Sequence, residues 1–224
     1  MRRAGFRAIA GVDEAGRGSL FGPVFAAAVV LDPSKPIRGL DDSKRLPPER
    51  REILAARIRD RAAAWAIAAA DAFEIDRINI LQASRLAMRR AVERLEPACD
   101  YLLVDFVTVD IALPQVGLVH GDAVSFSIAA ASILAKVARD AALTAWDRVF
   151  PGYGLASNKG YMAPEHVAGL DRVGPTSLHR FSFEPVRAAR RPGQPLWAGY
   201  PQSPGYSQPG LQPHPRQREL FACL

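Results

Sequence analysis

The chain has little cysteine. Its 224 residues include only Cys99 and Cys223. Two such distant cysteines give neither the framework of a disulfide-stapled domain nor the paired spacing of a zinc site. Cysteine chemistry is therefore excluded as the organising feature, and any metal ion is expected on oxygen ligands.

Long apolar runs are also lacking. The N-terminus carries Arg2, Arg3 and Arg7, but Asp13 and Glu14 interrupt the next apolar stretch before a signal-peptide core could form. No window approaches the roughly 20 apolar residues of a membrane helix. Hydrophobic residues still make up 49% of the chain. We therefore expect a soluble, cytoplasmic protein, monomeric by default, with one ordinary domain plus an appendage.

Lysine is scarce, and the charge is uneven. The formal charge is +6, but residues 187–224 hold a surplus of four, which leaves +2 for the rest. So weak a field permits nucleic-acid binding without demanding it. The only lysines are Lys35, Lys44, Lys136 and Lys159, and the compact charge of lysine suits contact with phosphate.

Apolar segments alternate with helical patterns along the first 150 residues. Strands are predicted at 6–13 and 22–31, paired as a hairpin, and at 65–72, 101–105 and 117–120. Helices are predicted over 48–63, 75–95 and 123–149. This order predicts an α/β domain in which helices pack on a mixed sheet.

Two adjacent acids precede a glycine turn near the N-terminus. Asp13 and Glu14 end an apolar run, and Gly16-Arg17-Gly18 follows. Buried acids at a strand end are costly unless paired or bound to a cation, and glycine lets the backbone approach a phosphate or sugar. The segment indicates a divalent metal and a phosphodiester, although a solvated acidic turn explains it equally well when it is taken alone.

Three further acids fall at informative positions. Asp105 ends a predicted strand, where α/β sheets commonly place their chemistry. Asp122 begins a small-residue helix, where capping is the commoner role of an aspartate. Asp140 lies farther along that helix and is expected to pair with a neighbouring Arg or Lys.

The side chains of Asp13, Glu14, Asp105 and Asp122 could together form an oxygen-only site at one end of the sheet. Such ligands select Mg²⁺ or Mn²⁺. Two ions about 3.5 to 4 Å apart could activate a water and stabilise the leaving 3′ oxygen during phosphodiester cleavage. Because neighbours on a strand face opposite sides, Asp13 and Glu14 can share an ion only if the chain bends, which the glycine turn allows.

Six sequence blocks occur in the order found in bacterial ribonuclease HII. They are GVDEAGRGSLFGPV (11–24), DSK (42–44), VD (104–105), GD with SIAAASILAKVARD (121–140), YGLASNKGY (153–161) and GP with HRFSF (174–183). Any one block is weak, but six in order are not expected by chance. From about residue 8 to 186, the chain therefore resembles this family.

The resemblance implies a ribonuclease H-like fold in residues 1–186. It implies cleavage of the RNA strand of RNA–DNA hybrids, including 5′ of single ribonucleotides in duplex DNA, to leave 3′-hydroxyl and 5′-phosphate ends. Ribonucleotide excision repair and RNA primer removal are the implied roles. The implied catalytic and metal-binding set is Asp13, Glu14, Asp105 and Asp122, with Mg²⁺ or Mn²⁺ as cofactor.

The resemblance also implies a substrate-binding set. Gly16, Arg17 and Gly18 would read the ribose 2′-hydroxyl at the RNA-to-DNA junction. Tyr161 would stack on the neighbouring deoxyribose, while Lys44 and Lys159 would contact phosphates. From the residues alone, a half-buried core aromatic is the commoner role for Tyr161, and a solvated surface position is the alternative for each lysine.

Two positions depart from the family pattern. His120 stands where a lysine usually precedes the Gly-Asp pair, and Phe106 stands where a glycine usually follows the strand-end aspartate. Neither removes a carboxylate. His120 could contact phosphate or assist a proton transfer, although a lone histidine is more often structural. Phe106 restricts the local backbone, which is expected to affect substrate preference more than activity.

Residues 187–224 are rich in Pro, Gly and Gln and are predicted to form a disordered tail. Near its end, Gln217, Leu220 and Phe221 resemble the Gln-x-x-Leu-Phe peptide that docks on the bacterial sliding clamp. An inert tail is the alternative.

Other functions fit parts of the pattern. A hybrid-binding module without chemistry is disfavoured by the four acids. A junction resolvase or type HIII enzyme shares the fold class, but type HIII proteins usually carry an N-terminal domain, and barely ten residues precede the first block here. A nucleotide phosphate loop is disfavoured because Gly16-Arg17-Gly18 lacks the lysine and sits in a hairpin.

Overall fold

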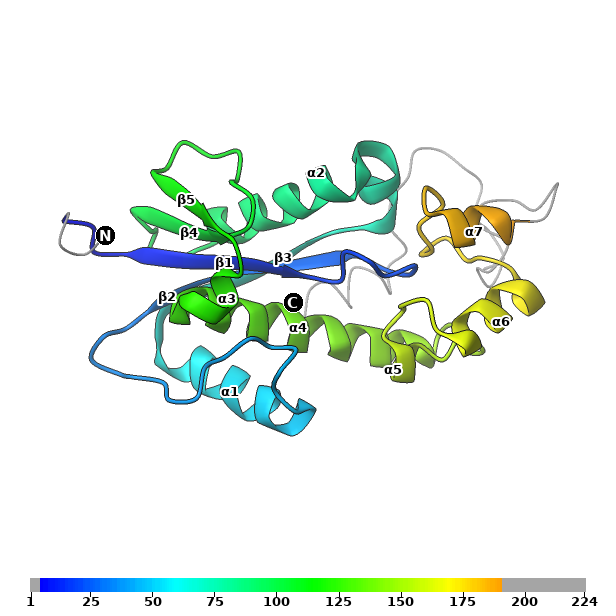
Figure 1. The fold of residues 1–224 in the computed structure, drawn as a ribbon, viewed down its shortest axis with the longest axis horizontal. Helices are drawn as coiled ribbons and strands as arrows, with labels where there is room; N and C mark the ends of the chain where they lie inside the picture. The colour runs from blue at the N-terminus through cyan, green and yellow to red at the C-terminus, as the bar shows by residue number, and fades with distance from the viewer. Residues whose placement is uncertain (1–4, 191–224) are drawn as a thin grey trace, which may run out of the picture.

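A five-stranded sheet runs through the protein in the order β3-β2-β1-β4-β5 (Figure 1). The computed structural model describes residues 5–190. The strands are β1 (Ile9–Ala15), β2 (Val24–Leu31), β3 (Ala62–Ala70), β4 (Tyr101–Asp105) and β5 (Gln115–Leu118). Because β1 pairs antiparallel with β2 and parallel with β4, the sheet is mixed, as predicted. The predicted hairpin is confirmed, and β1 is the central strand.

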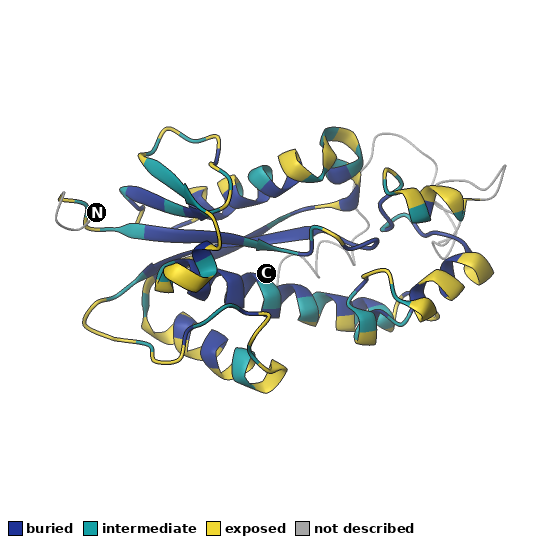
Figure 2. Ribbon diagram, in the orientation of Figure 1, coloured by how far each residue is buried: buried dark blue, intermediate teal, exposed yellow. Residues whose placement is uncertain are grey.

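Helices cover both faces of the sheet. Helix α2 (Ala72–Glu93) packs on one face, and α1 (Pro48–Arg61) and α4 (Phe126–Asp147) pack on the other (Figure 1). Alternate residues of β2 feed the two cores: Val24 lies in the cluster under α2, and Phe25 lies in the cluster under α4. Both faces of the strand are buried (Figure 2), which explains its unbroken apolar sequence.

Most element boundaries differ from the prediction by a few residues. Strand β3 begins at Ala62, directly after α1. This start was not predicted because the alanine-rich segment gives no boundary signal. Helix α2 begins at Ala72 because Asp71 and Glu74 form a capping box. That helix is also interrupted at Asn79, which has φ 66° and ψ 164°. Strand β5 lies two residues earlier than predicted.

The single helix predicted over 123–149 is wrong. A short helix α3 (Gly121–Val124) comes first, Ser125 is extended with φ −130°, and α4 starts at Phe126. The start of α4 presses against β1 at Gly11, where a Cβ atom would lie 2.0 Å from the backbone carbon of Ser127. Only glycine permits this approach. The break thus lets α3 follow β5 while α4 packs directly on the sheet.

The last described elements form a smaller subregion at one end of the sheet. They are α5 (Leu155–Asn158), α6 (Pro164–Val173) and α7 (Glu184–Ala188). Their core gathers around Phe21, Trp146 and Tyr153. Helix α7 continues two residues past position 186. Gln217, Leu220 and Phe221 lie outside the described residues.

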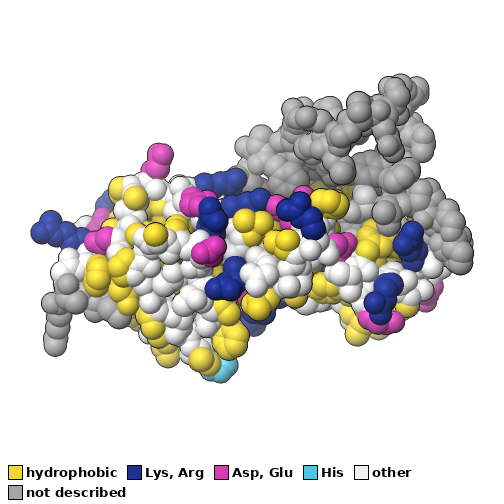
Figure 3. Space-filling model, turned by 90° about the horizontal axis from the view of Figure 1, so that it is seen from above, with side chains coloured by type: hydrophobic (Ala, Val, Ile, Leu, Met, Phe, Trp, Pro, Cys, Tyr) yellow, Lys and Arg dark blue, Asp and Glu magenta, His cyan; other side chains and the backbone are white. Residues whose placement is uncertain are grey.

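The surface above α2 carries charges of both signs. Figure 3 shows Lys and Arg side chains interleaved with Asp and Glu side chains there. This pattern is typical of a solvated face without a strong field of one sign. Among residues 5–190, no helix is both long and apolar enough to span a membrane.

Candidate active site

Asp13 and Asp105 are brought together by strand register. Val12 of β1 pairs with Val104 of β4 in parallel, so the next residues, Asp13 and Asp105, lie side by side on one face. That face packs on α4, because Gly11, two residues before Asp13, contacts Ser127. The two acids predicted from separate strand ends therefore share one location, at the carboxyl ends of β1 and β4.

Asp13 is buried, with an exposed fraction of 5%. Burial raises its pKa well above the ordinary value, and the charges of Glu14 and Asp105 raise it further. Hydrogen bonds from the Glu14 amide, at 2.7 Å, and from Ser132 oppose this rise. Ser132 is itself held by a 2.8 Å bond to the Ser43 hydroxyl. Ser43 thus positions the Ser132 hydroxyl that hydrogen bonds to Asp13.

Glu14 lies next to Asp13 with its side chain 9% exposed. Burial raises its pKa; Arg17, whose Nη1 is 3.3 Å from Oε1, opposes the rise, and Asp105 adds to it. The other carboxylate oxygen, Oε2, is buried and has no hydrogen-bond partner. A buried oxygen without a donor is costly, so it is suited to a cation.

Asp122 lies on α3 and does not cap a helix. His120 precedes α3 in the left-handed conformation, and Ser125 precedes α4, so capping by Asp122 is wrong. Asp105 holds the start of α3 by accepting a 2.7 Å bond from the Gly121 amide. Burial raises the pKa of Asp122. The charges of Asp42 and Asp105 raise it further, and Lys44 lowers it. Asp42, from the DSK block, is thus a further acid close to Asp122.

Asp105 is within electrostatic reach of the other three predicted acids, since it raises the pKa of each. Among residues 5–190, no three His, Cys, Asp or Glu side chains form a ready metal-binding group. The four acids approach one another without forming a finished coordination shell. Their oxygen donors, mutual repulsion and the unpartnered Glu14 Oε2 nevertheless fit a hard divalent cation. Asp140 is paired instead with Lys136 at 2.7 Å, as predicted.

The Gly16-Arg17-Gly18 turn is fixed from beneath by Arg180. This fully buried side chain donates from Nη2 to the Gly16 carbonyl at 2.8 Å and from Nη1 to the Arg17 carbonyl at 2.7 Å. Its Nε donates to the Gly22 carbonyl at 2.9 Å. In a trans peptide, the N–H points away from the carbonyl. The amides of Arg17 and Gly18 therefore point away from Arg180 and are available to a ligand.

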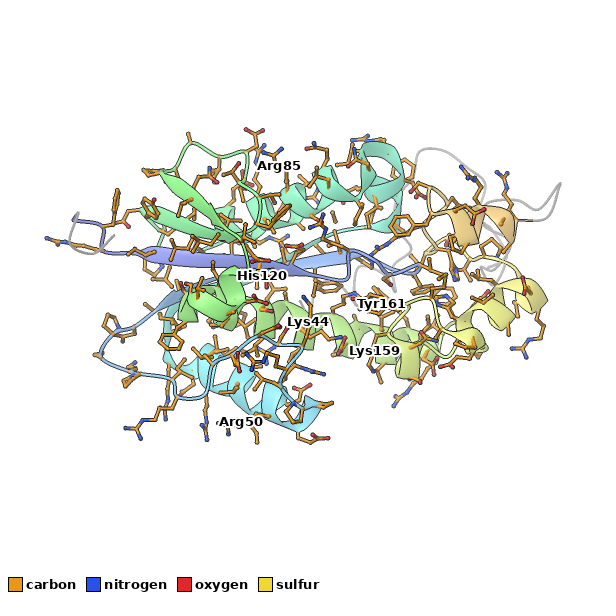
Figure 4. All side chains as sticks on the ribbon, viewed as in Figure 1. Lys44, Arg50, Arg85, His120, Lys159 and Tyr161 are labelled. Atoms are coloured by element: carbon orange, nitrogen blue, oxygen red, sulfur yellow. The ribbon has the colours of Figure 1, made fainter. Side chains whose placement is uncertain are left out.

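Tyr161 lies beside this turn. Its ring approaches Gly18, where a Cβ would be 3.9 Å from Cε1, and it stacks on the buried Arg139 guanidinium at 5.1 Å. Tyr161 is 39% exposed, so it is not a core aromatic. Lys159 donates to the Thr144 hydroxyl and to the Ala156 carbonyl. Figure 4 labels Lys44, His120, Lys159 and Tyr161 along one side of the sheet.

Several supporting residues were not assigned a role from sequence. Arg139 and Arg180 lie inside recognised blocks, but nothing in the sequence shows that arginines are buried. Ser132 and Ser43 read as ordinary small residues. Their roles depend on contacts between segments about 90 residues apart, such as the bond between these two hydroxyls, which no local pattern encodes.

The fold and its acids define a protein of the ribonuclease H class. The solved ribonuclease H2 from Pyrococcus horikoshii OT3 is similar with a TM-score of 0.69 and 25% identity, over 82% of this chain and 97% of that one. The Bst-RNase HIII structure with Mn²⁺ has the same fold, with a TM-score of 0.61 and 21% identity, over 81% of this chain and 68% of that one.

Sequence comparisons define the family more closely. The Ribonuclease HII family model matches residues 10–186. Ribonuclease HII of Solibacter usitatus (strain Ellin6076) is 64% identical over 191 residues, covering 85% of this chain and 84% of that protein. That of Koribacter versatilis (strain Ellin345) is 55% identical over 193 residues, covering 86% and 76%. The chain therefore belongs to the ribonuclease HII family. It is an endonuclease that hydrolyses RNA in RNA–DNA hybrids, in a divalent-metal-dependent reaction.

Proposed function

We propose that this protein cuts on the 5′ side of a ribonucleotide, including a single one in duplex DNA, and leaves 3′-hydroxyl and 5′-phosphate ends. One observation carries the proposal: four acids lie at the end of the sheet from which the Gly16-Arg17-Gly18 turn extends. Ribonucleotide excision repair and RNA primer removal are the cellular roles that such a reaction would serve. The protein would act in the cytoplasm and as a monomer.

Asp13, Glu14, Asp105 and Asp122 would hold Mg²⁺ or Mn²⁺. When bound, such ions supply an activated water and stabilise the leaving 3′ oxygen. Asp13 and Asp105 would bind the ions from neighbouring strands, Glu14 from the end of β1, and Asp122 from α3. Burial excludes water around Asp13 and strengthens its attraction to a cation.

The turn and Tyr161 would recognise the junction. The outward amides of Arg17 and Gly18 are donors that a ribose 2′-hydroxyl can accept from, and this group distinguishes RNA from DNA. Tyr161, half exposed and held by Arg139, would stack on the next deoxyribose. Lys44, which is exposed, and Lys159 would contact phosphates on the same side.

The test uses an end-labelled DNA duplex with one ribonucleotide, an all-DNA duplex of the same sequence, and an RNA–DNA hybrid, each with Mg²⁺ or Mn²⁺. We expect one cut 5′ of the ribonucleotide and none in all-DNA. A cut of the hybrid without any cut at the single ribonucleotide would refute recognition of the junction. Comparing the rates with the two ions would decide which one this chain prefers.

We also propose that Gln217, Leu220 and Phe221 dock on a sliding clamp. The support is the peptide itself and a solved complex of PCNA with RNase HII from Archaeoglobus fulgidus, which shares the fold at 24% identity. Capture of the full chain by purified bacterial clamp should be lost in the Leu220→Ala, Phe221→Ala double variant. Equal capture of both proteins would contradict the docking proposal.

A further inference from the structure

Backbone strain gathers around the active site. Residues 5–190 contain four non-glycine residues with positive φ: Asn79, Phe106, His120 and Lys159. Only Asn79 lies outside the segments that carry the site. Left-handed conformations are costly for residues with a side chain, and they persist where the surrounding structure enforces them, often at functional sites. Phe106 is the most unusual of the four, because bulky residues rarely adopt this conformation.

The surrounding sheet enforces the backbone of Phe106. Its amide donates to the Leu118 carbonyl of β5 at 2.9 Å. Its carbonyl approaches β5 at Gly117, where a Cβ would lie only 2.8 Å from the Phe106 oxygen. The chain must therefore turn sharply between Asp105 and Val107, with φ 62° at Phe106. Glycine would adopt this conformation without strain.

The Phe106 ring makes too little packing contact to offset this strain. It is 60% exposed, and its neighbour across the β5 end, Val119, is 66% exposed. An aromatic side chain left in water stabilises the fold little, since the hydrophobic contribution follows the area buried. Neither backbone conformation nor core packing therefore accounts for a phenylalanine at this position.

The position of Phe106 suggests what would cover it. It directly follows Asp105, whose carboxylate holds Gly121 at the start of the helix that carries Asp122. The cationic contacts proposed for phosphates, Lys44 and Lys159, come from other segments. Phosphates are bound by cations, whereas sugars and base faces of nucleic acids pack on aromatic rings. An exposed ring that directly follows Asp105 in the chain is thus suited to a nucleotide next to the cleaved bond.

We propose that Phe106 is a substrate-contact residue that stacks on a base or sugar of a nucleotide flanking the scissile phosphate. The proposal rests on the proposed function, because it assumes that Asp105 and Asp122 face the cleaved bond. It gives the site a second aromatic contact, from the β4–β5 connection, in addition to Tyr161 near α5. It also makes Phe106 a determinant of affinity for the bound strand, without a role in proton transfer.

Three substitutions separate the ring from the strained backbone. Phe106→Gly removes both the ring and the strain, Phe106→Ala removes only the ring, and Phe106→Trp keeps an aromatic. Phe73→Ala is the matched control, since Phe73 is 56% exposed but lies on α2 in regular helix. Duplexes with one ribonucleotide carry 2-aminopurine at each flanking position in turn, in either strand. Its fluorescence is quenched by stacking, and Asp13→Asn protein is used to prevent cleavage.

We expect Phe106→Gly to raise the unfolding midpoint by about 2 °C while it weakens duplex binding about tenfold. Phe106→Ala should weaken binding equally with no rise in midpoint, Phe106→Trp should restore binding, and Phe73→Ala should bind normally. At one or more flanking positions, 2-aminopurine should be quenched when Phe106 is present, both in the otherwise unsubstituted protein and in Phe73→Ala. The same quenching should be lost with Phe106→Gly. Identical binding and quenching for Phe106→Gly and the unsubstituted chain would overturn the proposal.

The proposed function is tested separately by the unsubstituted chain. Should it fail to cut the duplex with a single ribonucleotide, the proposed function fails before any variant is compared. Normal cutting by the unsubstituted chain, with an unchanged kcat/KM for Phe106→Gly, would refute only the role of Phe106.

Discussion

At position 16 only glycine fits. Gly16 has φ 96°, and a Cβ there would lie 2.0 Å from Nε of Arg139, which is fully buried. Gly18, two residues later, has ordinary φ and open space, with Tyr161 the nearest group at 3.9 Å. The two glycines of one motif therefore have different reasons to be glycine: Gly16 is required by the fold, and Gly18 leaves room for a ligand beside Tyr161.

This difference predicts opposite outcomes for two alanine substitutions. Gly16→Ala should lower the free energy of unfolding by about 2 kcal/mol, because strain and a clash with a buried side chain add together. Gly18→Ala should leave the free energy of unfolding within about 0.5 kcal/mol of the unsubstituted value but slow cleavage at a single ribonucleotide. Urea denaturation of both proteins checks the first claim, and equal destabilisation by both would contradict it.

A buried histidine pair links α6 to the site. The Thr176 amide donates to Nδ1 of His179 at 2.9 Å, so His179 carries its proton on Nε2 and donates it to Nε2 of His166 at 3.1 Å. His166 then donates from Nδ1 to the Tyr161 carbonyl at 2.9 Å. Every ring nitrogen is thus used in the neutral state, and a proton added to Nδ1 of His179 would break its bond from the Thr176 amide.

The pair predicts a loss of stability in mild acid. Burial, with a further contribution from His166, lowers the pKa of His179 to about 3, against 6.5 in the unfolded chain. Between pH 3 and pH 6.5 the unfolded state binds a proton that the folded state does not. The contribution of neutral His179 to the free energy of unfolding is therefore complete above pH 6.5 and is lost as the pH falls toward 3. The slope is about 1.4 kcal/mol per pH unit for one proton.

Denaturation at several pH values checks this slope. The free energy of unfolding of His179→Asn should change less steeply between pH 6.5 and pH 4 than that of the unsubstituted chain, whatever its absolute value. Parallel curves for the two proteins would show that His179 is not the group responsible.

At the level of elements, the contact between α4 and β1 positions the acids. Gly11 lets Ser127 and Ile128 press on the strand two residues before Asp13, and Ser132, farther along α4, hydrogen bonds to Asp13. The helix thus reaches the acid only because one side chain is missing from the strand.

Gly11→Ala should therefore harm both stability and catalysis. A Cβ at 2.0 to 2.3 Å from backbone atoms has no flexible neighbour to displace, so α4 must shift. We expect a loss of about 3 kcal/mol in the free energy of unfolding and lower kcat in the protein that remains folded. Gly18→Ala is the control for stability, because it is expected to keep the free energy of unfolding. An unchanged unfolding midpoint for Gly11→Ala would show that α4 does not pack on β1 as described.

The elements show where sequence patterns suffice. Strand β4 was predicted with its observed bounds because an apolar run ends cleanly at Asp105. The end of α1 and start of β3 were missed because alanine fits either structure, and seven of the nine residues from 62 to 70 are alanine. The break at Ser125 was missed because the sequence from 123 onward has continuous helical character. Tertiary contact at Gly11, not local propensity, decides where α4 begins.

For the whole molecule, the sequence predicted the sheet class and the placement of acids at strand ends, since motif order and polarity patterns carry that information. It did not predict the supports beneath the site. Arg180 reaches the turn across more than 160 residues, and Phe106 shows its strain only in three dimensions. Long-range hydrogen bonds and positive φ angles of bulky residues have no local sequence signature.

We expect cleavage to require the four acids to act as one metal-dependent site, and Asp13→Asn tests this most directly. Because the pKa of Asp13 is raised, its ionised form is disfavoured in the metal-free fold. Neutral asparagine should then keep or raise the unfolding midpoint in EDTA. Loss of one ion ligand should lower kcat/KM by about a thousandfold, or roughly 4 kcal/mol.

The measurement is kcat/KM of Asp13→Asn and of the unsubstituted chain on an end-labelled RNA–DNA hybrid with Mg²⁺, beside their unfolding midpoints in EDTA. We predict a loss of about a thousandfold in kcat/KM with an equal or higher midpoint. Retained cleavage by a folded Asp13→Asn protein would contradict the account.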